Sequence, residues 1–212
     1  MSHMVLQNRV NPWGVLCAVA NRGSLMGNRG ILHDESNRIV KCWAHKAWVT
    51  CLLSFKTIKR PRPFSQGNYS ELFFLDEATA FSAGHRPCAY CQRERHQRFK
   101  EAWLRANVAE TACSATTMLE IDRTLHSERA IRGGGKRTFD VKLSNLPVGA
   151  MFEYEGHAFL VATRGHLPWS FEGYGAPKNI DGITSVKVLT PESIVRTFAT
   201  GFSPNTHPSA ND

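Results

Sequence analysis

Residues 71–91 have the sequence ELFFLDEATAFSAGHRPCAYC, and this stretch decides the expected fold of the N-terminal half of the chain. Its apolar residues 72–75 predict a short buried strand. Asp76 is a typical helix N-cap, and it predicts a helix over 77–83 that Gly84 ends. A strand, a helix and a glycine stop therefore come directly before a pair of cysteines.

The pair Cys88 and Cys91 carries the strongest indication of chemistry. Two thiolates with two residues between them both reach one zinc ion at about 2.3 Å, so C-x2-C forms half of a tetrahedral site. A redox pair of the thioredoxin type and two plain buried cysteines are the alternatives. The chain has six cysteines in 212 residues, too sparse for the disulfide framework of a small secreted domain, and this favours a metal.

The same stretch resembles the second half of the zinc-binding module of the Ada family of DNA methyl-phosphotriester repair proteins. That family shows an aromatic strand, a short helix with alanines, Ala-Gly, an aromatic residue, then Arg-Pro-Cys-x-x-Cys; here His85 precedes Arg86 in place of the aromatic residue. The stretch is also similar to small Ada-like modules on bacterial nucleases, in which an upstream His and Cys complete the site. The resemblance implies zinc and DNA binding. The whole chain also resembles an uncharacterised bacterial protein family, which implies no function.

The upstream half of the site departs from the Ada pattern. The Ada-type upstream pair is Cys-x3-Cys, but Phe55 stands four positions after Cys51, and Lys46 stands four positions after Cys42. A cysteine that accepts a methyl group from a phosphotriester therefore cannot be assigned by the resemblance.

The nuclease-linked pattern has His-x3-Cys, and its closest counterpart here is His45-x5-Cys51. In an extended segment, two residues six positions apart point to the same face. Cys42 or His33 can replace either upstream ligand, and a plain core cysteine with a satisfied histidine is the alternative. The predicted zinc (Zn²⁺) ligands are His45, Cys51, Cys88 and Cys91.

The charge of the chain points to a polyanionic partner. It has 26 Lys+Arg against 18 Asp+Glu, a formal net charge of +8, and a basic field attracts polyanions whatever fold carries it. Basic residues concentrate in 56–62 and 86–105, where they can neutralise backbone phosphates of single- or double-stranded DNA. The phosphate contacts predicted from these clusters are Arg60, Arg62, Arg86 and Arg93. A solvated charged face around a purely structural zinc is the alternative.

Two glycine-rich segments add candidate contacts to DNA. In residues 22–30 the glycines allow backbone N–H groups to approach a phosphate, with Asn28 and Arg29 beside them; a turn-rich hairpin explains the same glycines. In the expected loop 166–175, Trp169 and Tyr174 can stack on an extruded base, although a packed aromatic corner has the same composition.

The hypothesis of a catalytic function depends on a helix predicted over 116–129. Asp122, His126 and Arg129 share one face of it, so a carboxylate and a histidine can form an acid/base pair; ion pairing on the helix surface is the alternative. Lys136, on the glycine joint after residue 132, is a candidate amine nucleophile. These groups predict, as the second hypothesis, a base-excision glycosylase or a nuclease.

The sequence therefore predicts an α+β protein. Residues 1–132 are expected to form an Ada-like zinc-binding region with basic helices, and residues 133–212 a small antiparallel β subdomain with a C-terminal helix. The leading hypothesis is DNA binding in repair or damage response; a metal-stabilised module that binds protein is a third. No run of about 20 apolar residues and no secretion pattern is found, so a cytoplasmic protein without membrane contact is expected.

Overall fold

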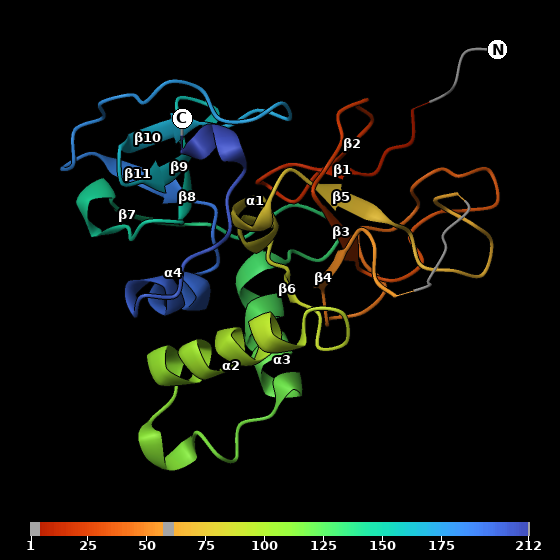
Figure 1. The fold of residues 1–212 in the computed structure, drawn as a ribbon, viewed down its shortest axis with the longest axis horizontal. Coiled ribbons are helices and arrows are strands. Elements are labelled where there is room, and N and C mark those ends of the chain that lie inside the picture. The colour runs from red at the N-terminus through yellow and green to blue at the C-terminus, as the bar shows by residue number, and fades with distance from the viewer. Residues whose placement is uncertain (1–4, 57–61, 212) are drawn as a thin grey trace.

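The computed structural model describes residues 5–56 and 62–211. In these residues four α-helices and two β-sheets form a mixed α+β fold, which confirms the predicted class (Figure 1). Helix α1 lies between the two sheets, and α2 and α3 lie together below them in this view. Among the described residues, no helix combines the length and the apolar character needed to cross a membrane.

The first sheet comes from the N-terminal part of the chain and has the strand order β2-β1-β5-β3-β4-β6. Its strands are β1 (Arg9–Val10), β2 (Leu16–Cys17), β3 (Leu25–Asn28), β4 (Val49–Leu52), β5 (Leu72–Phe74) and β6 (Arg86–Pro87). Strand β1 runs parallel to β5, and β4 runs parallel to β6; the other neighbours are antiparallel. The predicted strand at 72–75 is confirmed as β5, and its Leu72 and Phe74 are fully buried.

The second sheet is antiparallel throughout, in the order β10-β9-β8-β11-β7. Its strands are β7 (Phe139–Lys142), β8 (Met151–Tyr154), β9 (His157–Ala162), β10 (Gly165–Pro168) and β11 (Ser185–Val188). In β11, Val186 and Val188 are buried while Ser185 and Lys187 are exposed, the alternation of a half-buried strand. The predicted loop at 166–175 overlaps β10, because His166 and Leu167 pair with β9.

The helices are α1 (Glu77–Ser82), α2 (Arg93–Asn107), α3 (Met118–Arg129) and α4 (Glu192–Ala199), with 3-10 turns at Glu110–Ala112, Leu143–Asn145 and Pro208–Ala210. The predicted cap of α1 is confirmed, because the side chain of Asp76 accepts a hydrogen bond from the Thr79 N–H at 2.8 Å. Gly84 has φ +86°, and the Arg129 side chain packs where a Cβ would stand. Glycine is therefore required at this helix end.

One hydrophobic cluster contains side chains from both sides of residue 133. Phe81, Phe99 and Trp103 from the N-terminal segment pack in it with Phe152 and Ile194 from the C-terminal segment. The helical region and the second sheet therefore share a core.

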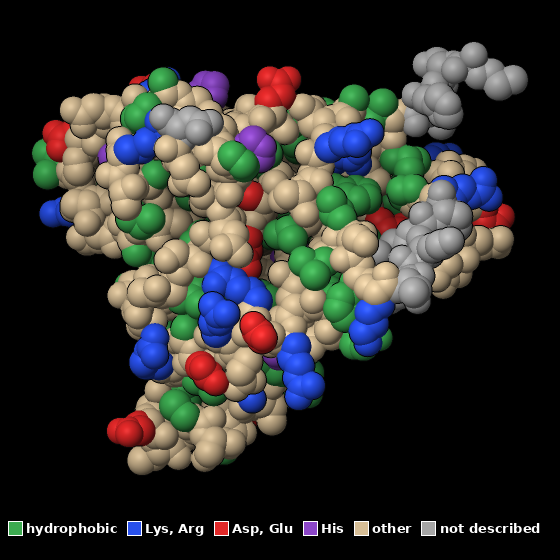
Figure 2. Space-filling model, viewed as in Figure 1, with side chains coloured by type: hydrophobic (Ala, Val, Ile, Leu, Met, Phe, Trp, Pro, Cys, Tyr) green, Lys and Arg blue, Asp and Glu red, His purple; other side chains and the backbone are tan. Residues whose placement is uncertain are grey.

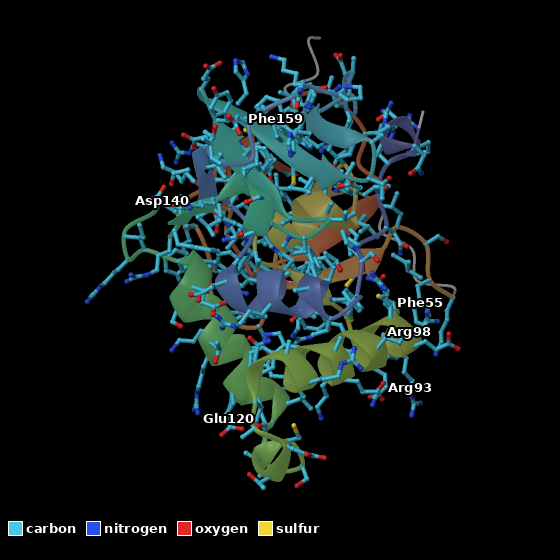
Figure 3. All side chains as sticks on the ribbon, turned by 90° about the vertical axis from the view of Figure 1, so that its left-hand side faces the viewer. Phe55, Arg93, Arg98, Glu120, Asp140 and Phe159 are labelled. Atoms are coloured by element: carbon cyan, nitrogen blue, oxygen red, sulfur yellow. The ribbon has the colours of Figure 1, made fainter. Side chains whose placement is uncertain are left out.

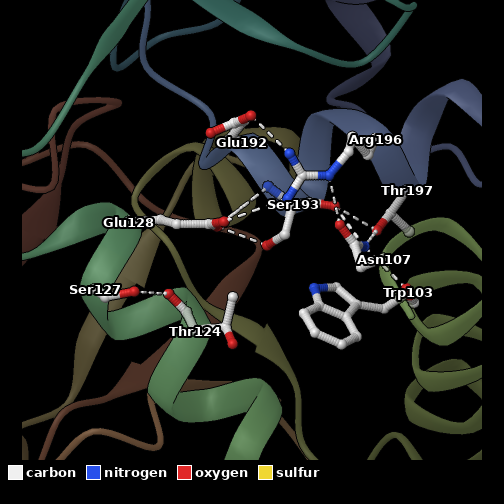
Figure 4. A network of polar contacts seen from close by, with 9 residues as sticks. All are labelled: Trp103, Asn107, Thr124, Ser127, Glu128, Glu192, Ser193, Arg196 and Thr197. Atoms are coloured by element: carbon white, nitrogen blue, oxygen red, sulfur yellow. Dashed lines mark hydrogen bonds and ion pairs between the residues drawn. The ribbon is translucent and has the colours of Figure 1, made fainter. Parts of the chain in front are cut away.

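A polar network also joins the helices (Figure 4). Glu128 of α3 accepts a hydrogen bond from the Ser193 hydroxyl of α4 at 2.6 Å. Asn107 at the end of α2 donates to the Ser193 carbonyl oxygen at 3.1 Å and accepts from the Arg196 guanidinium at 2.7 Å. The network fixes α4 against α2 and α3, so the C-terminal helix belongs to the shared core rather than to the second sheet alone.

Candidate metal centre and basic surface

The sulfur atoms of Cys51, Cys88 and Cys91 form one cluster in which all three lie within 4.8 Å of one another. Cys51 lies on β4, Cys88 follows β6, and Cys91 comes just before α2. The parallel pairing of β4 with β6 sets Thr50 opposite Pro87, which brings the next residue of each strand together. The cluster can hold a metal ion, and three of the four predicted ligands are in it.

The turn after β6 surrounds Cys88 with hydrogen-bond donors. The Tyr90 N–H donates to the Cys88 sulfur at 3.4 Å, and the Cys88 N–H donates to the Thr50 carbonyl oxygen at 2.9 Å. The Cys51 thiol, with the N–H groups of Cys91 and Tyr90, lowers the pKa of Cys88 to about 4. Hydrogen bonding to Cys88, followed by burial, raises the pKa of Cys51. The Cys88 thiolate thus faces the Cys51 thiol, and a bound metal would displace the proton of that thiol.

His45 does not join the cysteines, so the expected four-ligand set is wrong at this position. The even spacing from Cys51 has meaning only in an extended segment, but β4 begins at Val49, and Trp48 turns back to donate hydrogen bonds to the carbonyl oxygens of His45 and Lys46. Among the described residues, no further His, Cys, Asp or Glu completes the cluster. The alternative ligands lie elsewhere: Cys42 lines a separate cavity, and His33 stacks on Phe64.

A basic and aromatic surface lies beside the cysteines. We define it as the metal-side surface, and its residues are Phe55, Lys56, Tyr90, Arg93 and Arg98. Phe55 and Tyr90 meet edge to face at 5.2 Å, and the Lys56 ammonium lies about 5 Å from each ring. Tyr90 is 62% exposed, and Arg93 and Arg98 are exposed. Figure 3 shows Phe55, Arg93 and Arg98 on one side of the molecule.

A shallow cavity of about 610 Å³ is lined by Phe55, Tyr90, Cys91, Arg93 and Arg98 among others, so the surface reaches the metal centre itself. Lys and Arg side chains also gather over the helical part below the sheets, with Asp and Glu between them (Figure 2). The sequence indicated Arg93 as a phosphate contact and Tyr90 as an aromatic residue near the basic clusters, but it missed Phe55, whose contact with Tyr90 joins two distant segments. Of the other predicted contacts, Arg62 is exposed and Arg60 lies outside the described residues.

Arg86 is not free to contact DNA. Its guanidinium forms a bidentate pair with Asp122, with both N–O distances 2.7 Å, and the two residues are only 7% and 4% exposed. The same pair occupies both carboxylate oxygens of Asp122, so Asp122 does not act with His126 as an acid/base pair. The predicted helical face is correct, but it faces the core: His126 packs edge-on against Trp43 and Trp48.

The aromatic residues expected to stack on a base have structural partners. The Tyr174 hydroxyl is buried and donates to Asp76 at 2.8 Å, and the Trp169 indole N–H donates to Thr79 at 3.0 Å. Both therefore anchor the second sheet to α1, the packed corner that was the alternative. Asn28 has a local role as well, because its side-chain oxygen accepts the Gly30 N–H at 2.7 Å.

Arg29 and Lys136, predicted in separate roles, lie together at a second cavity. Both line it with Arg129, and both are hydrogen-bonded to backbone carbonyl groups, of Gly14 and Ser82 respectively. The Lys136 ammonium donates to the carbonyl oxygen of Ser82, the last residue of α1.

His85, next to these cations, gives the fold a pH dependence. The ring is fully buried, and its Nε2 accepts a hydrogen bond from the Arg29 Nε at 3.2 Å. Burial, followed by the charges of Arg29, Arg129 and Lys136, lowers the pKa of His85 well below its ordinary value. Below about pH 6.5 the unfolded chain therefore takes up a proton that the folded chain excludes, and stability falls by about 1.4 kcal/mol per pH unit while the ring stays neutral.

We expect the free energy of unfolding in urea to fall between pH 7.5 and pH 5.5, with His85 contributing about 1.4 kcal/mol of that fall. In His85→Gln the amide oxygen still accepts from Arg29 but cannot be protonated, so the decline should shrink by this amount. Equal declines in the two proteins would show that His85 is not held neutral.

No protein-family model, no curated protein and no solved structure matches the chain.

Proposed function

We propose that the chain binds one zinc ion through Cys51, Cys88 and Cys91 and that it binds DNA through the metal-side surface. The observation that carries the proposal is the meeting of three sulfur atoms, from two separate segments, within 4.8 Å of one another. Thiolates are ligands that zinc favours, and three of them leave the fourth tetrahedral position to a water molecule or another donor.

The metal-side surface suits a nucleic acid better than a protein partner. Lys56, Arg93 and Arg98 supply three exposed cations for backbone phosphates, and the exposed ring of Tyr90 supplies a face for stacking on a base. Zinc would hold β4 and the turn before α2 together, and these two segments carry the surface. A role in repair or damage response, which the Ada resemblance implies, is part of this proposal.

The test is the binding of fluorescein-labelled DNA, single- and double-stranded, measured by anisotropy at several salt concentrations. Each lost phosphate contact reduces the slope of log affinity against log salt by about 0.7 to 0.9. We expect Arg93→Gln/Arg98→Gln to weaken binding about tenfold and to reduce the slope by about 1.5.

The matched control is Arg22→Gln/Arg132→Gln, which removes two exposed arginines outside the metal-side surface. Its affinity and slope should stay within twofold of those of the unchanged protein. Equal losses of affinity in both double variants would show that DNA binding depends on net charge and not on the metal-side surface. The absence of salt-dependent binding by the unchanged protein would refute DNA binding.

A further inference from the structure

A second cavity, of about 240 Å³, lies next to the pairing of β3 with β4 and opens to solvent. We call it the tryptophan cavity. Three tryptophans and three cationic side chains line it: Trp13, Trp43, Trp48, Arg29, Arg129 and Lys136. Its rim includes the exposed residues Gln7, Val15 and Cys42. It shares no lining residue with the shallow cavity beside the cysteines.

The positive charge in this cavity is buried. Arg29 and Arg129 are each 2% exposed, and each guanidinium carbon lies 4.1 Å from the ring centre of Trp48. The ammonium of Lys136 donates to the Ser82 carbonyl oxygen, and Arg129 donates to the carbonyl oxygens of Gly84 and Lys46. Carbonyl dipoles offset only part of a buried charge.

Neither arginine nor the lysine has a carboxylate partner. Among the ion pairs of the described residues, none includes Arg29, Arg129 or Lys136, and the nearby Asp122 is paired with Arg86. The three cations therefore line one cavity without an ion-pair partner, and the carboxylates of Asp122 and Glu128 offset the charge of Arg129 only from a distance. Burial and the charges of both arginines lower the pKa of Lys136 well below its ordinary value.

One nitrogen of Arg29 also has no acceptor. Its Nε donates to His85 and its Nη1 to the Gly14 carbonyl oxygen, but Nη2 is buried without a hydrogen-bond partner. The Nε of Arg129 is in the same situation. A buried donor without a partner costs about 1 to 3 kcal/mol, more when it is charged. An anion in the cavity would supply both the missing acceptor and the missing negative charge.

We propose that the tryptophan cavity binds a small planar ligand that combines an aromatic ring with one anionic group, a carboxylate or a phosphate. The anionic group would contact Arg29, Arg129 and Lys136, and the ring would lie against the half-buried Trp43. Trp48 is 4% exposed and already carries both guanidinium groups on its ring, so it forms the floor of the site, 6.0 Å from Trp43. The site is separate from the zinc and DNA proposal and does not depend on it.

Calorimetric titration of the full chain tests the site with five probes. Benzoate and deoxyadenosine monophosphate carry a ring and an anion; benzamide and deoxyadenosine are their neutral counterparts; inorganic phosphate has no ring. We expect benzoate or the monophosphate to bind at least tenfold more tightly than its neutral counterpart, and which of the two binds identifies the anion. Binding of neither overturns the proposal. If the neutral counterpart binds equally well, the proposed contact with an anionic group is wrong. If inorganic phosphate binds as tightly as the monophosphate, the proposed contact with an aromatic ring is wrong.

Lys136→Met is the informative variant, because it removes one cation from the cavity and keeps the length of the side chain. We expect it to bind the preferred probe at least tenfold more weakly. The control Lys142→Met changes an exposed lysine on β7 and should bind as the unchanged protein does.

Folding is checked on the same samples by urea unfolding. Because Lys136 is half-buried beside two arginines without an ion-pair partner, Lys136→Met should unfold at or above the urea midpoint of the unchanged protein. A folded Lys136→Met that binds with unchanged affinity overturns the proposed role of the lysine. Arg29→Lys keeps the charge but removes the unpartnered Nη2, so it should bind more weakly than the unchanged protein and more tightly than Arg29→Met.

Discussion

Replacement of Cys51 by serine is expected to remove the bound zinc and to lower the free energy of unfolding by at least about 3 kcal/mol. Cys51 is the one ligand on β4, while Cys88 and Cys91 belong to the turn between β6 and α2. A hydroxyl is a much poorer zinc ligand than a thiolate, and the two remaining ligands come from a single turn. The variant therefore loses the link between this turn and the first sheet.

Elemental analysis of protein purified without a metal-affinity step, combined with urea unfolding, measures both effects. Adding a chelator should bring the unchanged protein to the stability of Cys51→Ser and leave the variant itself unaffected.

Cys17→Ser is the matched control, because Cys17 is half-buried on β2 and its sulfur lies 3.8 Å from the Val15 carbonyl oxygen. It should retain one zinc per chain and lose less than about 1 kcal/mol. One zinc per chain in Cys51→Ser as well would exclude the three-cysteine site.

The local features of residues 71–91 could be predicted from the sequence because short-range chemistry determines them. An aspartate cap, a short apolar run and a glycine with positive φ act within a few residues, and all three are found where the pattern indicates. The prediction that Cys51 lies with Cys88 and Cys91 is also confirmed. The argument that paired Cys51 with His45 was wrong, because an even spacing places two side chains on one face only within a strand, and His45 lies before β4.

The depth of a charged side chain could not be predicted, because it depends on contacts far apart in the sequence. Arg86 and Asp122 are 36 positions apart, and their pairing is set by how α3 packs against the end of β6. Arg29, Arg129 and Lys136 are likewise brought to one cavity from three distant segments. The sequence assigns these residues to phosphate contacts or to a catalytic face; in the fold Arg29, Arg86, Asp122 and Arg129 are buried.

The pairing of Arg86 with Asp122 leads to the second large effect: Asp122→Ala is expected to lower the free energy of unfolding by about 3 to 5 kcal/mol. The loss exceeds the value of the pair itself, because Arg86 stays buried with its charge uncompensated and Arg129 nearby. Arg86→Met/Asp122→Leu, which removes both charges, should recover most of the loss. Urea unfolding of these two variants and of the unchanged protein measures the differences.

Asp34→Ala provides the comparison on the surface, where Asp34 pairs with an Arg38 side chain that is 77% exposed. An exposed pair contributes about 0 to 1 kcal/mol. Asp34 also accepts the exposed N–H groups of Ser36 and Arg38, which water can replace, so this variant should lose about 1 kcal/mol or less. A loss in Asp122→Ala no larger than in Asp34→Ala would contradict the burial of the first pair. Zinc content separates stability from metal binding: Asp122→Ala leaves all three thiols in place, so at temperatures where it is folded it should retain one zinc per chain. Retained zinc with lowered stability assigns Asp122 to holding β6 against α3, and not to the chemistry of the metal centre.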